Sequence, residues 1–155
     1  MLPFGVMKDC GLPRYDYEKE CWDCDDYVFD RTLQGHTDWI STVIQLNDGR
    51  IVSGSGFGDE TLRIWDNTTG ELVHTLTGHT GYIFTVIQLN DGRLVSGSRD
   101  RTLCIWNSTT GELMQTLRGH TDLITTVIQL NDGRIVSGSG DDTLRIWRPL
   151  SRPSM

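Results

Sequence analysis

The chain has 155 residues, 17 glycines and a formal net charge of −7. This length is typical of one domain, and an acidic chain without clustered lysine or arginine argues against nucleic acid, because phosphate binding requires such clusters. No apolar run approaches the roughly 20 residues of a membrane span, and the first eight residues lack the pattern of a secretion signal. We therefore expect a cytoplasmic or nuclear protein that binds neither nucleic acid nor a membrane.

Residues 1–26 form an acidic extension that matches no other part of the chain. This extension contains Cys10, Cys21 and Cys24. A Cys-x-x-Cys pair can hold half of a zinc site or form a redox disulfide. The sequence offers no convincing fourth zinc ligand, and the βαβ context of a thioredoxin-like site is absent. We therefore predict no metal and no cofactor, and these three cysteines are the candidates that a metal assay would test.

From residue 27 to residue 148 one pattern occurs three times. Gly-His-Thr opens a block at residues 35, 78 and 119, and each block closes on Ile-Trp. A fixed period of about 40 residues indicates an array of one supersecondary unit. A unit this small cannot bury its own apolar face, so the blocks must stack on one another or on another chain. The blocks span approximately 35–77, 78–118 and 119–148, and a tail follows at 149–155.

The second block shows the expected elements clearly. Residues 82–89 are rich in β-branched and aromatic side chains and contain no glycine or proline, which predicts a strand. The Asn-Asp-Gly sequence at 90–92 follows, and Asp-Gly between apolar runs is a strong hairpin signal. Further strands are predicted over 93–98, 102–106 and 112–117. Each block is therefore expected to form a four-stranded antiparallel meander.

Taken together, the Gly-His opening, the Ser-Gly-Ser-x-Asp centre and the Trp-Asp end resemble the WD40 repeat. The resemblance implies an all-β protein built from WD40-type β-propeller blades, each a four-stranded antiparallel sheet packed face to face on its neighbours around a channel. It also implies a non-enzymatic scaffold for protein–protein interaction. The closing pair is literal in the first block and altered in the later two: Trp65-Asp66, Trp106-Asn107 and Trp147-Arg148.

Four residues recur at matching positions in every block. In the WD40 family these positions form a hydrogen-bonded tetrad, in which the tryptophan N–H meets the serine, the serine meets the histidine and the histidine meets a turn aspartate. A second serine lies two residues further along each strand (Ser55, Ser98, Ser139), so spacing alone leaves the choice of serine open. The structural tetrads implied by the resemblance are His36, Ser53, Asp59 and Trp65; His79, Ser96, Asp100 and Trp106; and His120, Ser137, Asp141 and Trp147.

A Ser-His-Asp set can also act as the relay of a hydrolase. Three copies of one relay, each closed by a tryptophan, make little sense as catalysis. Buried polar groups, by contrast, must find partners or cost about 1–3 kcal/mol each. We therefore assign the sets to structure and expect no catalytic residue and no enzymatic activity.

The array begins with the pattern of a fourth strand and ends after a third strand. The last block stops after the strand predicted over 143–147, and Tyr27–Leu33 precedes Gly35 as residues 71–76 precede Gly78. In the WD40 family this offset closes the ring, so the resemblance implies that the N-terminal strand completes the last blade. Closed propellers typically have four to eight blades. We expect a head-to-tail homodimer with a six-bladed ring, and a fragment or an open arc is the alternative.

The blocks differ most just after Gly-His, where the resemblance places residues on the top face. An aromatic-rich rim beside acidic residues there could anchor a peptide bearing arginine or lysine, although the aromatic side chains could instead only pack between blades. Phe57, in a two-residue insertion, is a second candidate contact, whereas Arg99 and Arg101 are interpreted as a solvated turn. The partner-binding candidates are Trp39, Ser41, Tyr82, Phe84, Leu123 and Thr125.

Three classes of function remain open at this point. The leading one is an interaction scaffold that binds a protein or peptide on its top face. A second is a substrate-receptor subunit of a larger assembly such as a ubiquitin ligase, which rests on fold analogy alone, or a shortened copy of a longer WD-repeat protein. The third is an enzyme, acting through a tetrad or through Cys21 and Cys24.

Overall fold

A computed structural model describes residues 15–16, 21–22 and 27–150. The chain divides into two units, residues 1–31 and 32–155. In the first unit, β1 (Tyr15–Asp16) pairs antiparallel with β2 (Cys21–Trp22). Cys10 and Cys24 lie outside the described residues. For Cys21 only its place in β2 is described.

The second unit consists of three antiparallel sheets, each built from consecutive strands. The first sheet comprises β3 (Ile40–Gln45), β4 (Ile51–Ser55), β5 (Leu62–Trp65) and β6 (Leu72–Leu76). The second sheet comprises β7 (Ile83–Gln88), β8 (Leu94–Ser98), β9 (Thr102–Trp106) and β10 (Leu113–Arg118). The third sheet comprises β11 (Ile124–Gln129), β12 (Ile135–Ser139) and β13 (Leu144–Trp147).

The predicted meander of the second block is confirmed, with strand ends within about one residue of those expected. The β7–β8 turn depends on Gly92, whose φ of 90° lies in the region that favours glycine. Gly49 and Gly133 occupy the same place in the other two sheets, with φ of 92° and 86°. The Asp-Gly signal therefore has the same physical cause in all three blocks.

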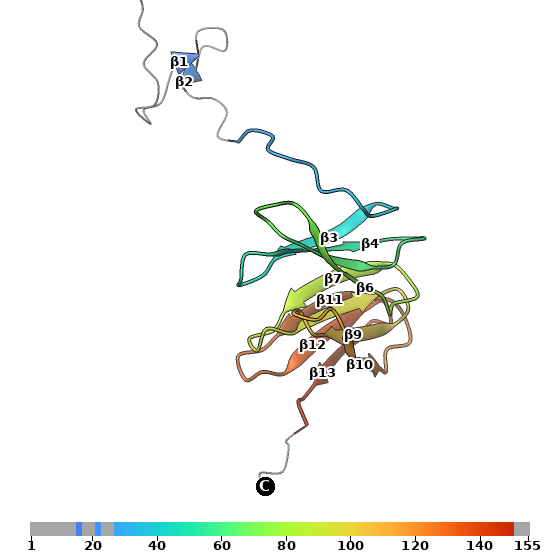
Figure 1. Cartoon of the computed structure of the whole chain (residues 1–155). Helices are drawn as coiled ribbons and strands as arrows, with labels where there is room; N and C mark the ends of the chain where they lie inside the picture. Colours follow the sequence, from blue (N-terminus) through green and yellow to red (C-terminus); the bar gives the residue numbers. More distant parts are fainter. Residues whose placement is uncertain (1–14, 17–20, 23–26, 151–155) are drawn as a thin grey trace, which may run out of the picture. The chain divides into compact units, whose positions relative to one another are not determined.

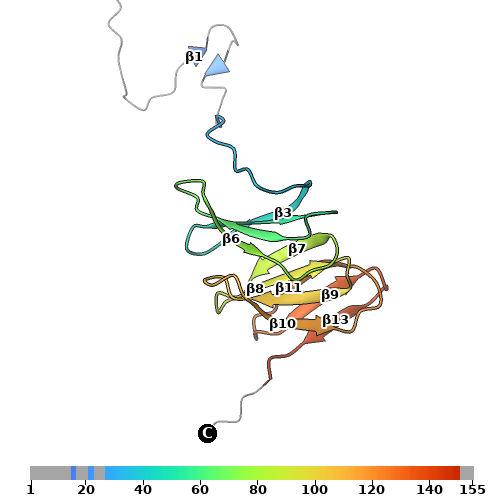
Figure 2. The ribbon, with the colours of Figure 1, turned by 45° about the vertical axis from the view of Figure 1, so that its right-hand side comes forward.

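The sheets stack face to face, and the second sheet lies between the first, which contains β3, and the third, which contains β13 (Figures 1 and 2). Two hydrophobic clusters fill the spaces between them. Leu62 of β5 lies in one cluster with Ile83 and Val86 of β7. Leu103 of β9 lies in the other with Ile124 of β11. The all-β architecture of propeller blades is confirmed, but the three sheets do not close into a ring.

Two details differ from three complete four-stranded blades. Within residues 27–150 the third sheet has three strands, and β13 pairs only with β12. The expected strand at Tyr27–Leu33 is not formed: residues 27–39 lie outside any strand. A strand exists only through ladder hydrogen bonds to a neighbour. Within the described residues of this single chain, the segment pairs with no strand edge.

No helix among the residues described here is long and apolar enough to cross a membrane.

Candidate functional site

The four recurring residues of each block lie together in each sheet. In the first sheet, Trp65 Nε1 donates to Ser53 Oγ at 2.8 Å, Ser53 Oγ lies 2.7 Å from His36 Nε2, and His36 Nδ1 lies 2.9 Å from Asp59 Oδ2. The corresponding distances in the second sheet are 2.8, 2.7 and 2.7 Å, and in the third they are 2.9, 2.8 and 2.8 Å. The histidine ring also meets the tryptophan edge-on in every sheet.

The structure distinguishes the two serines that the sequence left open. Ser96 accepts the indole hydrogen bond, whereas Ser98 donates through its hydroxyl to the Gly81 carbonyl at 2.9 Å. The outer sheets repeat this division: Ser55 bonds to the Trp39 carbonyl at 3.0 Å and Ser139 to the Asp122 carbonyl at 3.0 Å. The second serine of each pair therefore holds the loop that leads into the first strand of its sheet.

Each tetrad aspartate also fixes the chain around it. Asp100 Oδ2 accepts from the Thr80 amide at 3.0 Å, and its other oxygen accepts from the Thr102 hydroxyl at 2.6 Å. One carboxylate thus joins the Gly-His-Thr loop to the turn before β9. With the serine engaged by tryptophan and the histidine side chain buried, the set gives a substrate no access to a nucleophile. Its geometry favours structure over a hydrolase relay.

In the tetrad of the second sheet, the hydrogen bond between His79 and Asp100 favours the charged forms of both side chains. Burial disfavours the charged form of His79, but the hydrogen bond to Asp100 and the neighbouring Cys104 outweigh it and raise the pKa of His79 to about 9. Burial likewise opposes ionisation of Asp100, yet its hydrogen bonds with His79 and Thr102 hold its pKa below the usual range. Cys104, whose sulfur lies 3.7 Å from His79 Nδ1, occupies the position of Arg63 and Arg145 in the other two sheets.

An aromatic cluster lies where the first two sheets meet. The ring of Trp39 meets Tyr82 edge-on at a centroid distance of 5.1 Å, and Phe57 meets the same ring at 6.0 Å. Phe84 packs beside Tyr82 at 4.4 Å. Trp39 is 61% exposed and Phe57 54% exposed, whereas Tyr82 is 8% exposed. Tyr82 is therefore a buried support, and Trp39 and Phe57 are the aromatic side chains that face solvent.

Arg99 extends this cluster, which we call the aromatic surface: Trp39, Phe57, Tyr82, Phe84 and Arg99. Its guanidinium carbon lies 4.8 Å from the centre of the Phe57 ring. The sequence interpretation of Arg99 as a solvated turn residue missed this contact, because it joins the β4–β5 and β8–β9 turns of different sheets. Phe57 itself was visible in the sequence as part of an insertion.

The other predicted contacts lie apart from this cluster or serve the backbone. Ser41 Oγ donates to the carbonyls of Gly54, at 3.0 Å, and of Ile83, and so ties the first sheet to the second. Thr125 occupies the equivalent place on β11 and is exposed, and Leu123 is half-buried. No group of three or more His, Cys, Asp or Glu residues able to hold a metal ion occurs within the described part of the chain.

Comparisons with known proteins identify the repeat. The family model described as WD domain, G-beta repeat matches residues 28–66, 70–107 and 111–148. The nuclear distribution protein PAC1 of Arthroderma benhamiae is 41% identical over 51 residues, which is 33% of this chain and 11% of that protein. THO complex subunit 6 of Arabidopsis thaliana is 39% identical over 54 residues, 34% of this chain and 14% of that protein. The alignments span a small part of these curated relatives.

Solved structures show the same architecture. The WD40 beta propeller domain of Doa1 superposes with a TM-score of 0.69 and 29% identity, covering 75% of this chain and 38% of that one. The structure of U3-55K gives a TM-score of 0.70 at 24% identity, covering 76% of this chain and 38% of that one, a likeness of fold alone. In both cases the three sheets match less than half of the solved chain.

Proposed function

Since the chain belongs to the WD40 (G-beta) repeat family, we propose that it is a non-enzymatic interaction scaffold whose aromatic surface binds a protein or peptide partner. The family fold is generally a scaffold for protein assembly, and one relative is by its name a subunit of a complex. We place this activity in the cytoplasm or the nucleus, in keeping with relatives described as a nuclear distribution protein and a THO complex subunit. In this proposal the chain catalyses no reaction.

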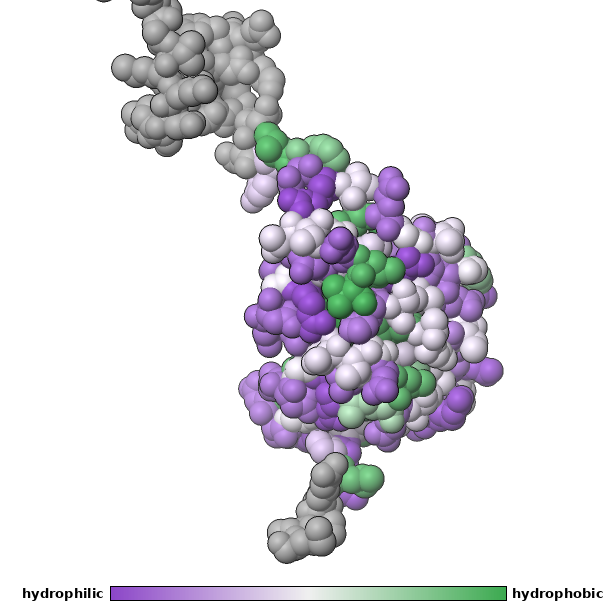
Figure 3. Space-filling view, in the orientation of Figure 1, coloured by the Kyte–Doolittle hydropathy of each residue, from purple (hydrophilic) through white to green (hydrophobic). Residues whose placement is uncertain are grey.

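The observation that carries the proposal is the exposure of Trp39 and Phe57, which both contact the buried ring of Tyr82. Exposed aromatic side chains supported from below are typical anchors of binding surfaces, since they bury much apolar area and lose little rotamer freedom. Tyr82 provides the base, because it contacts both rings and is itself buried. Figure 3 shows that exposed hydrophobic side chains interrupt the hydrophilic surface of the stacked sheets.

The chemistry of the surface favours a partner segment that contains arginine or lysine. Arg99 already lies over the Phe57 ring, so this ring has the environment in which a guanidinium binds an aromatic face. Trp39 carries the exposed indole, the best aromatic partner for a cation.

A peptide-array and titration experiment tests this function. Short arginine- or lysine-containing peptides are screened on the wild type, and the best binder is titrated by calorimetry against a Trp39→Ala/Phe57→Ala variant. We expect the affinity to fall at least about tenfold in the variant. Met114→Ala is the matched control, because Met114 is exposed on β10 and belongs to another surface, and it should leave the affinity unchanged.

Two results would count against the proposal: equal affinity in the aromatic variant, or equal binding of peptides in which arginine and lysine are replaced by alanine. Affinity capture from a cell extract with the same variants then addresses the substrate-receptor alternative. Recovery of ligase subunits that survive the aromatic substitutions would favour that role, with the attachment to the ligase made elsewhere on the chain.

A further inference from the structure

The outer strand of the third sheet has an unpaired edge that the equivalent strands of the other sheets do not have. β5 pairs with β6, and β9 pairs with β10, but among the residues that the structure describes β13 pairs only with β12. Residues 148–150, which follow β13, form no strand. The consequence is visible at one position: Leu62 and Leu103 are fully buried at 0% exposure, whereas the equivalent Leu144 is 72% exposed.

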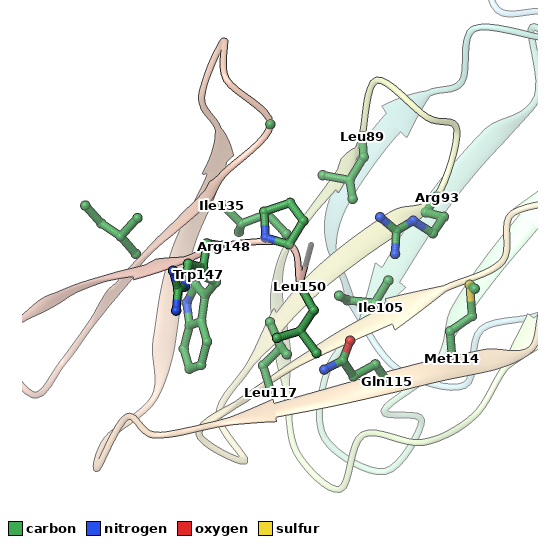
Figure 4. A pocket seen from close by; sticks show the side chains of 13 residues that line it. Leu89, Arg93, Ile105, Met114, Gln115, Leu117, Ile135, Trp147, Arg148 and Leu150 are labelled. Atoms are coloured by element: carbon green, nitrogen blue, oxygen red, sulfur yellow. The ribbon is translucent and has the colours of Figure 1, made fainter. Parts of the chain in front are cut away.

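A pocket of about 730 Å³ opens beside this edge. Ile105 and Leu117 of the second sheet form one wall, and Ile135 and Trp147 of the third sheet form the other (Figure 4). Ile146 of β13 also lines the pocket. Between the first and second sheets the corresponding space is occupied, because His74 of β6 bonds to the Thr109 carbonyl in the turn that leads to β10, at 2.8 Å. The pocket therefore lies where a fourth strand and its turn belong.

Residues 27–33 carry the sequence of that fourth strand. Thr32-Leu33, two residues before Gly35, match Thr75-Leu76 of β6 before Gly78 and Thr116-Leu117 of β10 before Gly119. The family model begins its first match at residue 28, and so includes this segment in the repeat. Yet the segment forms no strand in the single chain, and Tyr27, Val28 and Phe29 are all more than four-fifths exposed.

The segment cannot reach β13 of its own chain. His36 is bound to Asp59 of the first sheet, and Leu33 lies three residues before it, which allows a reach of about 10 Å. The third sheet lies beyond the second, and two face-to-face sheet spacings amount to about 20 Å. Where residues 27–33 pair with the β13 edge, they must therefore belong to another molecule.

The outer face of the first sheet is the other half of the same interface. Ile40 and Val43 are 51% and 59% exposed, whereas their equivalents Ile83, Val86, Ile124 and Val127 are buried against the preceding sheet. The third sheet exposes Ile128 and Ile146 on the side that would meet such a face. Because the blocks nearly repeat one sequence, the first sheet of one copy presents to the third sheet of another the contacts already made twice within the chain.

We propose that two copies of this chain form a closed pair, in which residues Tyr27–Leu33 of each copy pair with the β13 edge of the other and the first sheet of each packs on the third sheet of the other. The six sheets complete a ring, a number within the range of closed propellers. The register follows from β5–β6, where Leu62 faces Leu76 and Arg63 faces Thr75. Leu33 of one copy thus faces Leu144 of the other, and Thr32 faces Arg145. This pairing goes beyond the proposed partner binding, which uses a different surface.

Light scattering after size-exclusion chromatography provides the first test. The wild type is expected at twice the 17.5 kDa chain mass. Leu33→Asp should shift it to a single chain or weaken the pair at least tenfold, while Gln34→Asp should not, because the equivalents of Gln34, Thr77 and Arg118, are exposed. A wild type of single-chain mass, a mass above two chains, or equal behaviour of the two variants overturns the closed pair.

Two further measurements separate strand exchange from misfolding. Ile146→Asp should also prevent pairing, yet mixing it with Leu33→Asp should restore association, because one of the two interfaces is then intact on both sides. Failure of the mixture to associate, while both variants keep a β-type circular dichroism spectrum, overturns the exchange.

The register is tested with Thr32→Cys/Arg145→Cys in a background where Cys10, Cys21 and Cys24 are serine. Oxidation should give a disulfide-linked pair, since facing residues of paired strands lie within disulfide range. Arg31→Cys/Arg145→Cys places one cysteine on the opposite face of the strand. This variant should give at least tenfold less disulfide-linked pair. Equal cross-linking of both variants overturns the register.

Discussion

The second and third sheets carry nearly the same sequence in different surroundings. Leu103 and Leu144, like Ile105 and Ile146, occupy matching positions on β9 and β13, yet the first of each pair is buried and the second exposed. The second sheet has a neighbour on both faces and a fourth strand at its outer edge, whereas the third has one neighbour and three strands. Burial in this molecule is therefore set by position in the stack and not by the block itself, as expected for an array of repeats.

The tetrads show the complementary behaviour. Their hydrogen bonds join side chains within one sheet, and the distances agree within about 0.2 Å among the three sheets. Position in the stack changes their surroundings instead. Trp106 is fully buried, whereas Trp147 is half-buried beside the pocket. Polar geometry is thus local to each block, and the apolar surroundings depend on neighbours.

The largest effect is expected for His79→Ala in the middle sheet. The substitution leaves Ser96 and the Asp100 carboxylate without their histidine partner in a buried network, and breaking a buried charged pair costs about 3–5 kcal/mol. Chemical unfolding followed by circular dichroism should show the loss. His120→Ala in the outer sheet is the comparison and should cost less, because Trp147 of its tetrad is half-buried whereas Trp106 is fully buried. A folded His79→Ala protein of wild-type stability would remove the structural role assigned to the tetrad.

A smaller loss of stability is expected for substitution of the leucine that occupies matching positions on β9 and β13. Leu103→Ala should lower the free energy of unfolding by about 3 kcal/mol, because it opens a cavity between the second and third sheets. Leu144→Ala should cost less than about 0.5 kcal/mol at protein concentrations where single chains dominate. Raising the concentration should reveal a cost for Leu144→Ala if β13 becomes buried in the pair. Equal costs for the two substitutions in single chains would contradict the positional account of burial.

The stability of the second sheet should depend on pH through His79. Because the pKa of His79 is raised from 6.5 to about 9, its contribution is full below pH 6.5 and is lost as the pH rises through 9. The pKa of Asp100 is lowered, so its contribution is present above pH 3.8 and is lost on acidification. We expect the free energy of unfolding to fall by on the order of 1–3 kcal/mol between pH 6.5 and 9.

His79→Gln provides the control for this dependence, because glutamine cannot titrate and should flatten the alkaline decline. Cys104→Ser should reduce the decline, since Cys104 is one of the groups that raise the pKa of His79. An unchanged alkaline slope in His79→Gln would assign the decline to other groups.

The sequence predicted much of this structure because the signals are local. The Asp-Gly turn at Asp91-Gly92 and the strands of the second block follow from residues close to one another in the chain. The support of Phe57 by Tyr82 and the position of Arg99 over Phe57 depend on contacts between sheets, which no local pattern encodes. The same limit applies to Tyr27–Leu33, whose strand pattern is clear but whose pairing edge lies elsewhere.

A small effect on stability is also expected for the exposed indole of the aromatic surface. Trp39→Ala should lower the free energy of unfolding by less than about 1 kcal/mol, because the indole is 61% exposed and contacts Tyr82 only by an edge. Tyr82→Ala, in the same cluster, should cost about 3 kcal/mol, since its ring is buried among Trp39, Phe57 and Phe84. Thermal unfolding compared with peptide titration separates the two roles: Trp39→Ala should lose binding and keep its melting temperature, and Tyr82→Ala should lose both. If Trp39→Ala destabilises the chain as much as Tyr82→Ala, the indole is part of the packing between sheets, and the partner must bind elsewhere.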